Sequence, residues 1–422
     1  MNRRCATRRQ FLQAGAAALS VPCFVVPSAL GLDRSPPSER IAVGFIGVGW
    51  KGLQGCYGSL VQSFLANPDC QAVAVCDVNR QACETAKTTI DLAYGNQDCA
   101  TYGDFRDLLA RDDIDAVAIA TPDHWHAIQT IQACRHGKDV YCEKPLSLTV
   151  REARAMVDAA RRYGRIVQTG SQSRSYANIR FACEALQRGA IGEIREVHVE
   201  CGGPSIDCNL PAVPTPEHID WDLWLGPAPW RPFHPVLADK GFRSYRDYSG
   251  GGMTDWGCHH FDLAQWALGM DGSGPVEIVP PDGKDVPYLT YRYANGVTVH
   301  HNSPQCQGGV FFVGSEGTAW GHGMSTRWRT EPKGLWTAPP GPRDTAQGAK
   351  AHSDNFLQCV RSRETPHADV EIGCRTVTFC HLGNIAYWLN RPIRWDPASE
   401  EIVGDEQAAR WLDRPKREPW DL

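Results

Sequence analysis

A glycine-rich turn at the end of an apolar strand is the feature that most constrains the fold of this chain. The apolar segment IAVGFI (41–46) runs directly into GVGWKG (47–52), a G-x-G-x-x-G sequence that we expect to open a helix. Glycines in this pattern allow a tight turn and let backbone amides approach a pyrophosphate, whose charge a helix N-terminus favours. Alone, the pattern also fits an ordinary turn, but here a helical segment and a second apolar strand follow at the expected lengths. The residues that we predict to form this dinucleotide-binding turn are Gly47, Val48, Gly49, Trp50, Lys51 and Gly52.

The second apolar strand, QAVAVCD (71–77), ends in an acidic residue, Asp77, about 25 residues after Gly52. A carboxylate at this place can accept hydrogen bonds from both hydroxyls of an adenosine ribose, and it would repel a 2′-phosphate. We therefore expect NAD rather than NADP as the cofactor, with Arg80 as the residue that could reverse this preference. Asp77 could also cap the helix that follows, alone or in addition.

Strand-like and helix-like segments alternate through the first third of the chain. Such alternation predicts a parallel sheet with helices on both faces, which is an α/β fold. We therefore expect a Rossmann dinucleotide-binding domain over residues 41–164. Its predicted strands are 41–47, 71–77, 100–102, 115–122 and 139–145, with helices from about Leu53, Arg80 and His126 and over 151–163.

The pattern changes after residue 164. One more strand (165–170) is followed by apolar or alternating segments at 194–202, 276–280, 288–296, 297–303, 308–315 and 317–323, broken by Asn-Gly and Glu-Gly turns. These predict an open, mostly antiparallel sheet, and so an α+β substrate and oligomerisation domain over 165–395, followed by a C-terminal tail over 396–422. Two late helical stretches, 352–361 and 374–389, are expected to pack against this sheet.

The N-terminus has the pattern of an export signal. TRRQFLQ (7–13) carries a twin arginine and precedes an apolar stretch over 14–26. About 13 apolar residues are too few to span a bilayer, which needs roughly 20, so we expect no stable membrane insertion. We predict a twin-arginine signal peptide over 1–30 and a Pro-containing linker over 31–40. The protein is then expected in the periplasm or outside the cell.

Composition excludes several classes of protein. The formal net charge is −5, and the predicted folded part has no run of Lys or Arg that could neutralise a phosphate backbone, so we expect no nucleic-acid partner. The 17 cysteines include no C-x-x-C pair, which argues against structural zinc and against a disulfide framework. We expect most of them to be buried thiols.

Two further motifs follow the next buried strands, ATPDHWHA (120–127) and YCEKPL (141–146). Together with GFIGVGWKG (44–52), they resemble the three signature segments of the glucose-fructose oxidoreductase / inositol dehydrogenase (Gfo/Idh/MocA) family. The resemblance implies that the T-P-x-H and E-K-P loops edge the nicotinamide and that Lys144 touches the reacting hydroxyl. The residues that it implies at the cofactor are Thr121, Pro122, His124, His126, Glu143 and Lys144.

A fourth segment, GGGMTDWGCHHFD (250–262), places Asp255, His259 and Asp262 at i, i+4 and i+7. On a helix these three residues would share one face. The family resemblance implies that Asp255 and His259 join Lys144 in a proton-handling group. Without the resemblance, the simpler interpretation of His259 is a core histidine held by a neighbour.

The likeness extends over nearly the whole predicted mature chain, including WDLWLGPAP (221–229), residues 352–356 and GNIA (383–386). One departure concerns the phosphate loop. Many relatives have Arg before its last glycine, whereas this chain has Lys51, which keeps the charge but lacks the planar fork of Arg. Contact of this side chain with a pyrophosphate therefore stays open.

The chemistry expected of such a site is the oxidation of a secondary alcohol. The hydroxyl proton must leave while hydride passes to the nicotinamide, and a lysine amine and a histidine can exchange that proton. Aromatic and Arg side chains in loops suit a sugar ring, although ordinary packing explains each of them singly as well. The residues that we expect at the substrate are Arg174, Tyr176, Trp224, Arg243, Tyr245 and His259.

Export would separate the enzyme from a pool that reoxidises free NADH. A tightly bound cofactor that takes hydride and returns it would avoid this problem. We therefore leave open net dehydrogenation of a sugar or cyclitol and, as an alternative, redox-neutral glycosidase action through a 3-keto intermediate. A further alternative is a non-catalytic sugar-binding protein.

Two remaining expectations concern metals and assembly. The histidine pairs His124/His126, His259/His260 and His300/His301 suggest a metal site, but hydride transfer to a nicotinamide needs no metal, so we expect none. The exposed face of the second sheet favours a homodimer or homotetramer.

Overall fold

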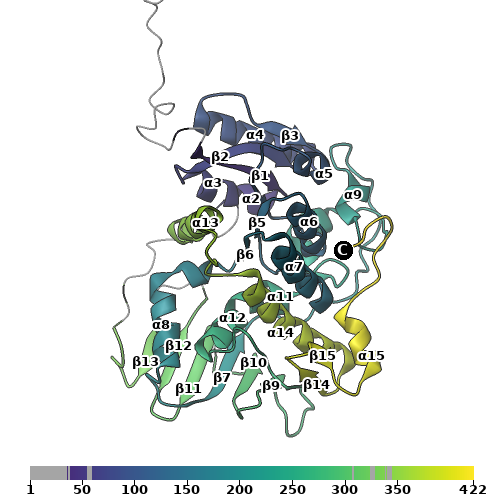
Figure 1. Ribbon diagram of the computed structural model, residues 1–422. Helices are drawn as coiled ribbons and strands as arrows, with labels where there is room; N and C mark the ends of the chain where they lie inside the picture. Colours follow the sequence, from purple (N-terminus) through teal and green to yellow (C-terminus); the bar gives the residue numbers. More distant parts are fainter. Residues whose placement is uncertain are drawn as a thin grey trace, which may run out of the picture. The chain divides into compact units, whose positions relative to one another are not determined.

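The first domain is a six-stranded sheet in which all pairs are parallel, with the strand order β3-β2-β1-β4-β5-β6 in the computed structural model (Figure 1). The order reverses between β1 and β4, which is the arrangement of Rossmann folds. The α/β fold predicted from alternation is confirmed. The strands are β1 (Ile41–Ile46), β2 (Cys70–Cys76), β3 (Ala100–Tyr102), β4 (Ala116–Ile119), β5 (Asp139–Cys142) and β6 (Val167–Thr169).

The structure describes residue 36, residues 39–54, 59–306, 308–323 and 328–337, residue 339, and residues 345–422. The predicted signal peptide (1–30) and most of the predicted linker (31–40) lie outside the described residues. The first strand begins at Ile41, where the linker was expected to end.

Helices connect the strands of this sheet, and local capping explains several of their ends. Asn79 caps α4, Thr149 caps α7, and Gly95 and Gly164 end these helices in the left-handed conformation. The helix after the glycine turn begins at Trp50, earlier than expected. The helices are α2 (Trp50–Leu53), α3 (Leu60–Leu65), α4 (Arg80–Tyr94), α5 (Phe105–Leu109), α6 (Asp123–Arg135) and α7 (Val150–Tyr163).

Among the described residues, the second sheet has nine strands in the order β13-β12-β11-β7-β10-β9-β8-β14-β15. Among the strand pairs of the described residues in this sheet, only β7–β10 is parallel, so the prediction of a mostly antiparallel sheet is confirmed. The strands are β7 (Ile194–Glu200), β8 (Glu277–Val279), β9 (Thr290–Arg292), β10 (Thr298–His301), β11 (Gly309–Gly314), β12 (Thr318–Gly321), β13 (Arg329–Glu331), β14 (Ile393–Asp396) and β15 (Glu401–Ile402).

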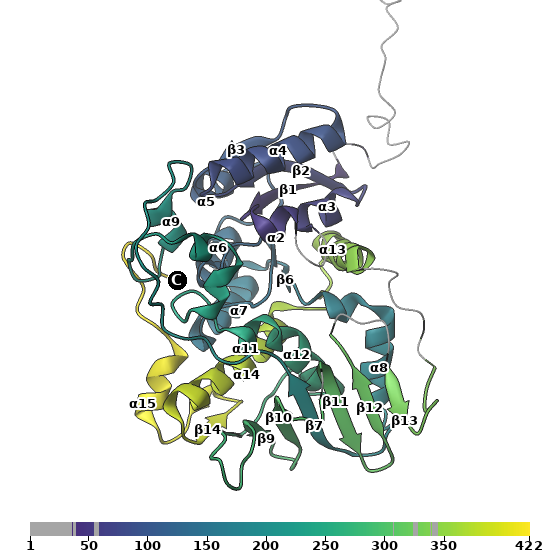
Figure 2. The ribbon, with the colours of Figure 1, turned by 180° about the vertical axis from the view of Figure 1, so that it is seen from behind.

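Helices α8 (Ala177–Gln187), α12 (Gly257–Ala267) and α14 (Val370–Leu389) lie along the second sheet (Figures 1 and 2). Helix α12 packs on β7 and β11, and α14 packs on α12 and β8. The expectation for the other late helix was wrong, because α13 (Thr345–Ser362) packs against α3 of the first domain. Its Phe356 lies 6.0 Å, between ring centroids, from both Phe64 and Tyr141, and this aromatic contact holds α13 there.

Shorter elements connect these parts. They are the 3-10 helices η3 (Gln172–Ser175), η4 (Lys240–Ser244) and η5 (Arg410–Leu412), and the helices α9 (Trp221–Leu225), α10 (Pro235–Ala238), α11 (Gly252–Asp255) and α15 (Glu406–Ala409).

Two of the expected boundaries differ from the structure. Strand β6 was expected in the second domain, but it pairs with β5 and completes the first sheet. The segment expected as a C-terminal tail (396–422) is packed: it contains β15, and the ring of Trp420 lies 4.6 Å from that of Trp125. Burial of apolar side chains such as Leu412, which is 1% exposed, explains why this segment does not extend into solvent.

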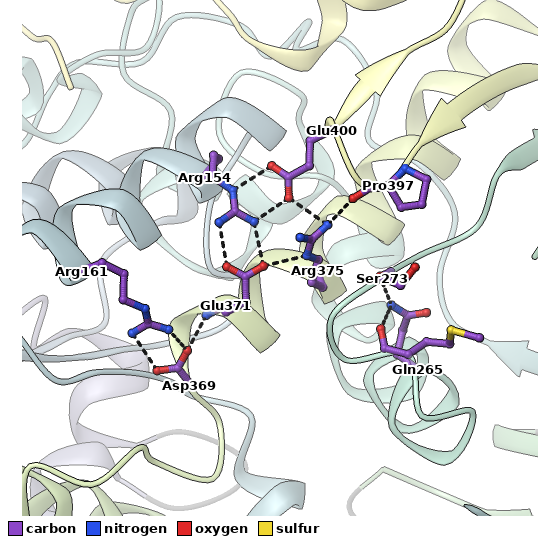
Figure 3. A network of polar contacts seen from close by, with 10 residues as sticks. Arg154, Arg161, Gln265, Ser273, Asp369, Glu371, Arg375, Pro397 and Glu400 are labelled. Carbon is purple, nitrogen blue, oxygen red and sulfur yellow. Dashed lines mark hydrogen bonds and ion pairs between the residues drawn. The ribbon is translucent and has the colours of Figure 1, made fainter.

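A network of ion pairs joins α7 of the first domain to the second domain (Figure 3). Arg154 donates to Glu371 at 2.7 Å and to Glu400 at 2.6 Å, and Arg375 also donates to both carboxylates. The hydrogen bonds from Arg154 and Arg375, together with the charges of these side chains, lower the pKa of Glu371 to about 2, against the opposing effect of its burial. The network therefore ties the helix after the E-K-P loop to α14.

The cysteines and the helices bear on two further expectations. The 14 cysteines within the described residues are free thiols, and all but Cys208 are buried. No helix in the described part of the chain is both long and apolar enough to cross a membrane.

Candidate active site

A cavity of about 310 Å³ opens where β1 and β4 end, at the point where the strand order of the first sheet reverses. Ligands of doubly wound sheets bind at such switch points. Residues of both domains line the cavity. Those from the predicted motifs are Gly47, Gly49, Trp50, Lys51, Asp77, Thr121, Pro122, Glu143, Lys144, Asp255 and His259.

The three glycines of the turn have different reasons to be glycine. Gly47 has φ +83°, and a Cβ there would lie 2.6 Å from the backbone nitrogen of Thr121. A Cβ on Gly52 would lie 3.0 Å from the carbonyl oxygen of Gly47. Gly49 faces open space, because a Cβ there would meet only Oδ2 of Asp77, at 3.8 Å. The turn is thus closed on the protein side and open on the cavity side, which fits close approach of a pyrophosphate.

Asp77 is held beneath this turn by backbone amides. Val48 N–H donates to its Oδ2 at 2.9 Å, and Asn79 N–H donates to its Oδ1 at 2.8 Å. Burial raises the pKa of Asp77, and these amide hydrogen bonds act in the opposite direction. Asn79 caps helix α4, so the capping role considered for Asp77 belongs to a neighbour. Asp77 lines the cavity, where its remaining lone pairs fit ribose hydroxyls.

Lys51 is engaged by the E-K-P loop. Its Nζ lies 3.5 Å from Oε1 of Glu143, which also accepts from Gln172 Nε2 at 3.0 Å. The buried Oε2 of Glu143 has no hydrogen-bond partner among the described residues. The lysine that replaces the more usual arginine therefore pairs the phosphate loop with Glu143.

Lys144 and Asp255 come from different domains and meet in the cavity. Lys144 Nζ donates to Oδ1 of Asp255 at 2.6 Å and to the backbone oxygen of Asp255 at 2.8 Å. Arg243 Nε lies 3.4 Å from the same carboxylate. Although burial opposes the change, the charges of Lys144 and Arg243 lower the pKa of Asp255 to about 2. Asp255 is therefore ionised and holds Lys144 in place.

His259 lines the same cavity from helix α12. Its ring is 2% exposed, and its Nδ1 has no hydrogen-bond partner among the described residues. Burial, followed by the positive charge of Lys144, lowers the pKa of His259 well below its usual value. The imidazole is therefore neutral at neutral pH and has a lone pair that can accept a proton.

The expected single helical face of Asp255, His259 and Asp262 is not observed. The helix is interrupted at Trp256, between α11 and α12. Asp262 lies outside the cavity, where it accepts a 2.8 Å hydrogen bond from Arg174. The spacing argument thus identified two cavity residues and one buried ion-pair residue.

Only some of the residues expected at the substrate line the cavity. Trp224 and Arg243 line the cavity. Arg174 does not, because it is 2% exposed and its guanidinium pairs with both Asp262 and Asp271. Tyr176, at 1% exposed, belongs to the core.

Tyr245 and both of the histidines expected at the cofactor also lie outside the cavity lining. Tyr245 packs against the aromatic cluster around Trp221. His124 is buried, its Nε2 donates to the carbonyl oxygen of Trp224 at 2.9 Å, and burial lowers the pKa of His124 to about 3. His126 is buried behind the T-P and E-K-P loops. Both histidine rings point into the protein because α6 turns its other face to the cavity.

Sequence reasoning missed several lining residues. Asp123 and Gln129 face the cavity from α6, beside the histidines that drew attention there, and Trp256 faces it beside His259. Lys240 lies with its Nζ 4.7 Å from the ring centroid of Trp50, which brings the 240–244 segment over the glycine turn. The cation–π spacing has no local sequence signal, since the partners are far apart in the chain. No group of three or more His, Cys, Asp or Glu side chains in the described regions is placed to hold a metal.

This fold and this cavity define a protein with a dinucleotide-binding Rossmann domain joined to an α+β domain. The model of the oxidoreductase family's NAD-binding Rossmann fold matches residues 41–171, and that of its C-terminal alpha/beta domain matches residues 205–422. The chain therefore belongs to the Gfo/Idh/MocA oxidoreductase family.

Curated relatives match part of the chain. A glycosyl hydrolase family 109 protein from Shewanella sp. (strain W3-18-1) is 38% identical over 138 residues, which are 32% of this chain and 29% of that protein. A second such protein, from Shewanella sp. (strain ANA-3), is 36% identical over 154 residues, which are 36% of this chain and 32% of that protein. The chain thus spans less than a third of the length of these relatives.

Solved structures share the fold. The aldose-aldose oxidoreductase from Caulobacter crescentus, complexed with glycerol, has a TM-score of 0.62 at 20% identity, covering 84% of this chain and 99% of that one. A putative myo-inositol dehydrogenase from Sinorhizobium meliloti 1021 has a TM-score of 0.54 at 20% identity, covering 84% of this chain and 99% of that one.

Proposed function

We propose that this chain oxidises a secondary hydroxyl of a sugar or cyclitol with a tightly bound NAD. One observation carries the proposal: Lys144, Asp255 and His259 line the same cavity as Gly47 and Gly49. A proton-exchanging group beside a dinucleotide turn is the arrangement that alcohol oxidation requires. The likeness to sugar-acting and cyclitol-acting oxidoreductases named above supports this substrate class.

Several residues would hold the cofactor. The backbone around Gly47 and Gly49 would bind the pyrophosphate, and Asp77 would bind the adenosine ribose. When bound, the nicotinamide accepts or returns a hydride. NAD is favoured over NADP because Asp77 lines the cavity, whereas Arg80 donates to the carbonyl oxygen of Glu217 at 2.6 Å.

The remaining cavity residues would handle the substrate. Lys144 is an ammonium donor held by Asp255, and it would hydrogen-bond the reacting oxygen. His259 is neutral, so it can accept the hydroxyl proton and later return it. Trp224 and Arg243 would bind the ring through an aromatic face and a guanidinium fork.

The second candidate is redox-neutral glycosidase action, which the family 109 relatives favour. A ketone at C3 of the sugar acidifies the neighbouring C–H, so base removal of that proton and elimination of the glycosidic oxygen become feasible. This route needs no pair of carboxylates flanking the glycosidic bond. A third candidate is a sugar-binding protein without activity.

Location and assembly are part of the proposal. The twin-arginine pattern of TRRQFLQ (7–13) supports export to the periplasm or beyond, and export of a folded protein would let it carry its cofactor along. Helices α8, α12 and α14 cover one face of the second sheet (Figure 2). The other face would pair two copies of the chain as a dimer, or four as a tetramer.

The first test is mass spectrometry of the denatured, as-purified protein. We expect NAD(H) at close to one molecule per chain; the absence of any dinucleotide would contradict the closed cycle. The purified protein is then given aryl glycosides without added NAD. Release of phenol identifies the glycosidase, whereas oxidation of a free sugar without phenol identifies the dehydrogenase.

Lys144→Met separates either enzyme from the sugar-binding protein. We expect a loss of at least about 100-fold in turnover, the usual order for a group that handles a proton. Lys284→Met is the matched control, because Lys284 is exposed in a surface turn. Equal sugar affinity and no measurable turnover in both variants and the parent would support the non-catalytic protein.

A further inference from the structure

His126 has an unusual pair of hydrogen-bond partners. Its Nδ1 lies 2.7 Å from the carbonyl oxygen of Pro145, and its Nε2 lies 2.8 Å from the carbonyl oxygen of Thr121. Carbonyl oxygens only accept hydrogen bonds, so both ring nitrogens must donate. A neutral imidazole carries one N–H, and only the protonated ring carries two. The side chain is 1% exposed, and both ring nitrogens lie within hydrogen-bond distance of these carbonyl oxygens.

Other buried histidines in the described residues have partners that a neutral ring satisfies. His352 pairs its Nδ1 with the hydroxyl of Ser175 and its Nε2 with the carbonyl oxygen of Thr169. His301 pairs its Nδ1 with the hydroxyl of Tyr387. Because a hydroxyl can donate as well as accept, these rings need only one N–H.

The surroundings of His126 stabilise a positive charge. Burial alone lowers the pKa of His126, but Cys142 on β5, Asp123 on α6 and the Pro145 carbonyl together raise it to about 9. The other titratable ring beside it, His124, is neutral because burial holds its pKa at about 3.

Asp123, near His126 on the same helix, is influenced by charged groups of both domains. Burial raises the pKa of Asp123, the charges of His126 and Arg243 oppose that rise, and Asp255 adds to it. The Oδ2 atom of Asp123 has no hydrogen-bond partner in the described part of the chain, and the residue is 3% exposed. Among the charges that oppose the effect of burial on this carboxyl group, that of His126, on the same helix, acts most strongly.

We propose that His126 is a buried imidazolium that clamps the loop after β4 to the loop after β5 and so positions Lys144. The clamp joins the carbonyl oxygen of Thr121, which lines the cavity, to that of Pro145, the residue that follows Lys144. Loss of one proton would leave two carbonyl oxygens competing for one N–H, and one of the two loops would be released. His126 is a positioning residue, because it does not line the cavity.

The protonation state does not depend on the proposed function, whereas the positioning role rests on it. The first test is therefore spectroscopic. In protein labelled with ¹⁵N-histidine, we expect one histidine whose two ring nitrogens both carry protons at pH 7.5, and we expect its signals to be absent from His126→Gln. His136→Gln, which changes an exposed histidine just after the end of the same helix, is the control and should keep them. A ring nitrogen of His126 with a free lone pair at pH 7.5 would overturn the clamp.

A second variant keeps the test decisive if His126→Gln does not fold. Asp123→Asn removes the carboxylate but keeps its shape, and it should lower the pH at which the His126 signals report loss of a proton. An unchanged midpoint would overturn the charge pairing with Asp123.

Turnover tests the positioning role. In His126→Gln we expect kcat to fall on the order of 100-fold, as misplacement of a reacting group does, while the KM for NAD changes far less. Unchanged kcat would overturn the positioning role. An inactive parent protein that still shows the doubly protonated ring would contradict the proposed function and leave the clamp intact.

Discussion

The ammonium nitrogen of Lys144 lies 2.6 Å from Oδ1 of Asp255, although 111 residues separate the two in the chain. The ion pair joins the loop after β5 of the Rossmann sheet to the last residue of α11, next to helix α12, which packs on the second sheet. Lys144 is 15% exposed and Asp255 26%, so the pair faces the cavity instead of being sealed in the core. It is the contact through which the second domain completes the site of the first.

Removing the Asp255 carboxylate should break its ion pair with Lys144. In Asp255→Asn the Lys144 ammonium loses its anion, and we expect kcat to fall by about 100-fold or more, the usual order for proton-handling groups. The amount of co-purified dinucleotide should stay the same, because Asp255 belongs to the second domain. Steady-state kinetics and mass spectrometry measure the two quantities. Asp282→Asn, in an exposed turn, is the control, and equal kcat in both variants would show that Asp255 has no part in the reaction.

Asp77 should set the choice of cofactor. Asp77→Ala removes two acceptors for ribose hydroxyls and one anchor of the glycine turn, so we expect NAD affinity to fall by about 10- to 100-fold, equivalent to the loss of one or two charged hydrogen bonds. NADP affinity should fall less or rise, since the repulsion of a 2′-phosphate is gone. Calorimetric titration of the apoprotein with both cofactors, with the exposed Asp112→Ala as control, measures the ratio. An unchanged ratio of NAD affinity to NADP affinity would show that Asp77 does not contribute to the choice of cofactor.

The low pKa of His259 predicts the acid side of the pH profile. Proton acceptance needs the neutral ring, and burial together with Lys144 holds the pKa of His259 well below 6.5. The rate should therefore stay high as the pH falls through 6.5, and it should decrease only at clearly lower pH. A profile of kcat/KM against pH checks this expectation, and a midpoint at or above 6.5 would contradict it.

The ion-pair network between α7 and α14 should stabilise the fold. Arg154→Met leaves the buried Glu400, at 7% exposed, and the partly buried Glu371 with one Arg between them. We expect a loss of about 1–3 kcal/mol in the free energy of unfolding, measured with urea. Arg188→Met breaks an exposed pair with Glu184 and should cost less than about 1 kcal/mol. Equal losses in the two variants would show that the network contributes no more than a surface pair.

The same network predicts a dependence on pH. Since the folded-state pKa of Glu371 is about 2, against a usual value of 4.5, its contribution to stability is present above pH 4.5 and is lost as the pH falls toward 2. The difference in unfolding free energy between the parent and Arg154→Met should therefore shrink over that interval. A difference that is constant from pH 5 to pH 2.5 would contradict the assignment.

Much of the fold was predictable from the sequence. The Rossmann strands, the glycine turn and Asp77 depend on short-range features: hydrophobic alternation, turn glycines and the end of a strand. Helix α13 was not placed correctly, because an amphipathic pattern shows that a helix has an apolar face without showing which surface covers it. In the structure, the Phe356 ring packs against Phe64 and Tyr141 of the first domain.

The candidate site, too, was only partly predictable from the sequence. The family resemblance pointed to Lys144, Asp255 and His259, which line one cavity. Arg174 was expected at the substrate because it lies in a loop, but its ion-pair partners place it outside the cavity. A guanidinium can bind a sugar or neutralise buried carboxylates, and only the positions of Asp262 and Asp271 select the second role.

By itself, then, the amino-acid sequence determined the class of fold and the dinucleotide turn, because both depend on neighbours within a few turns or strands, whereas the proton-exchanging groups were named through the family resemblance. Only the tertiary structure decided which of those groups face the cavity and which are buried in ion pairs. It also decided that His126 must serve two carbonyl oxygens. Burial and hydrogen bonding between different elements of the fold set these outcomes, and the local sequence pattern specifies neither.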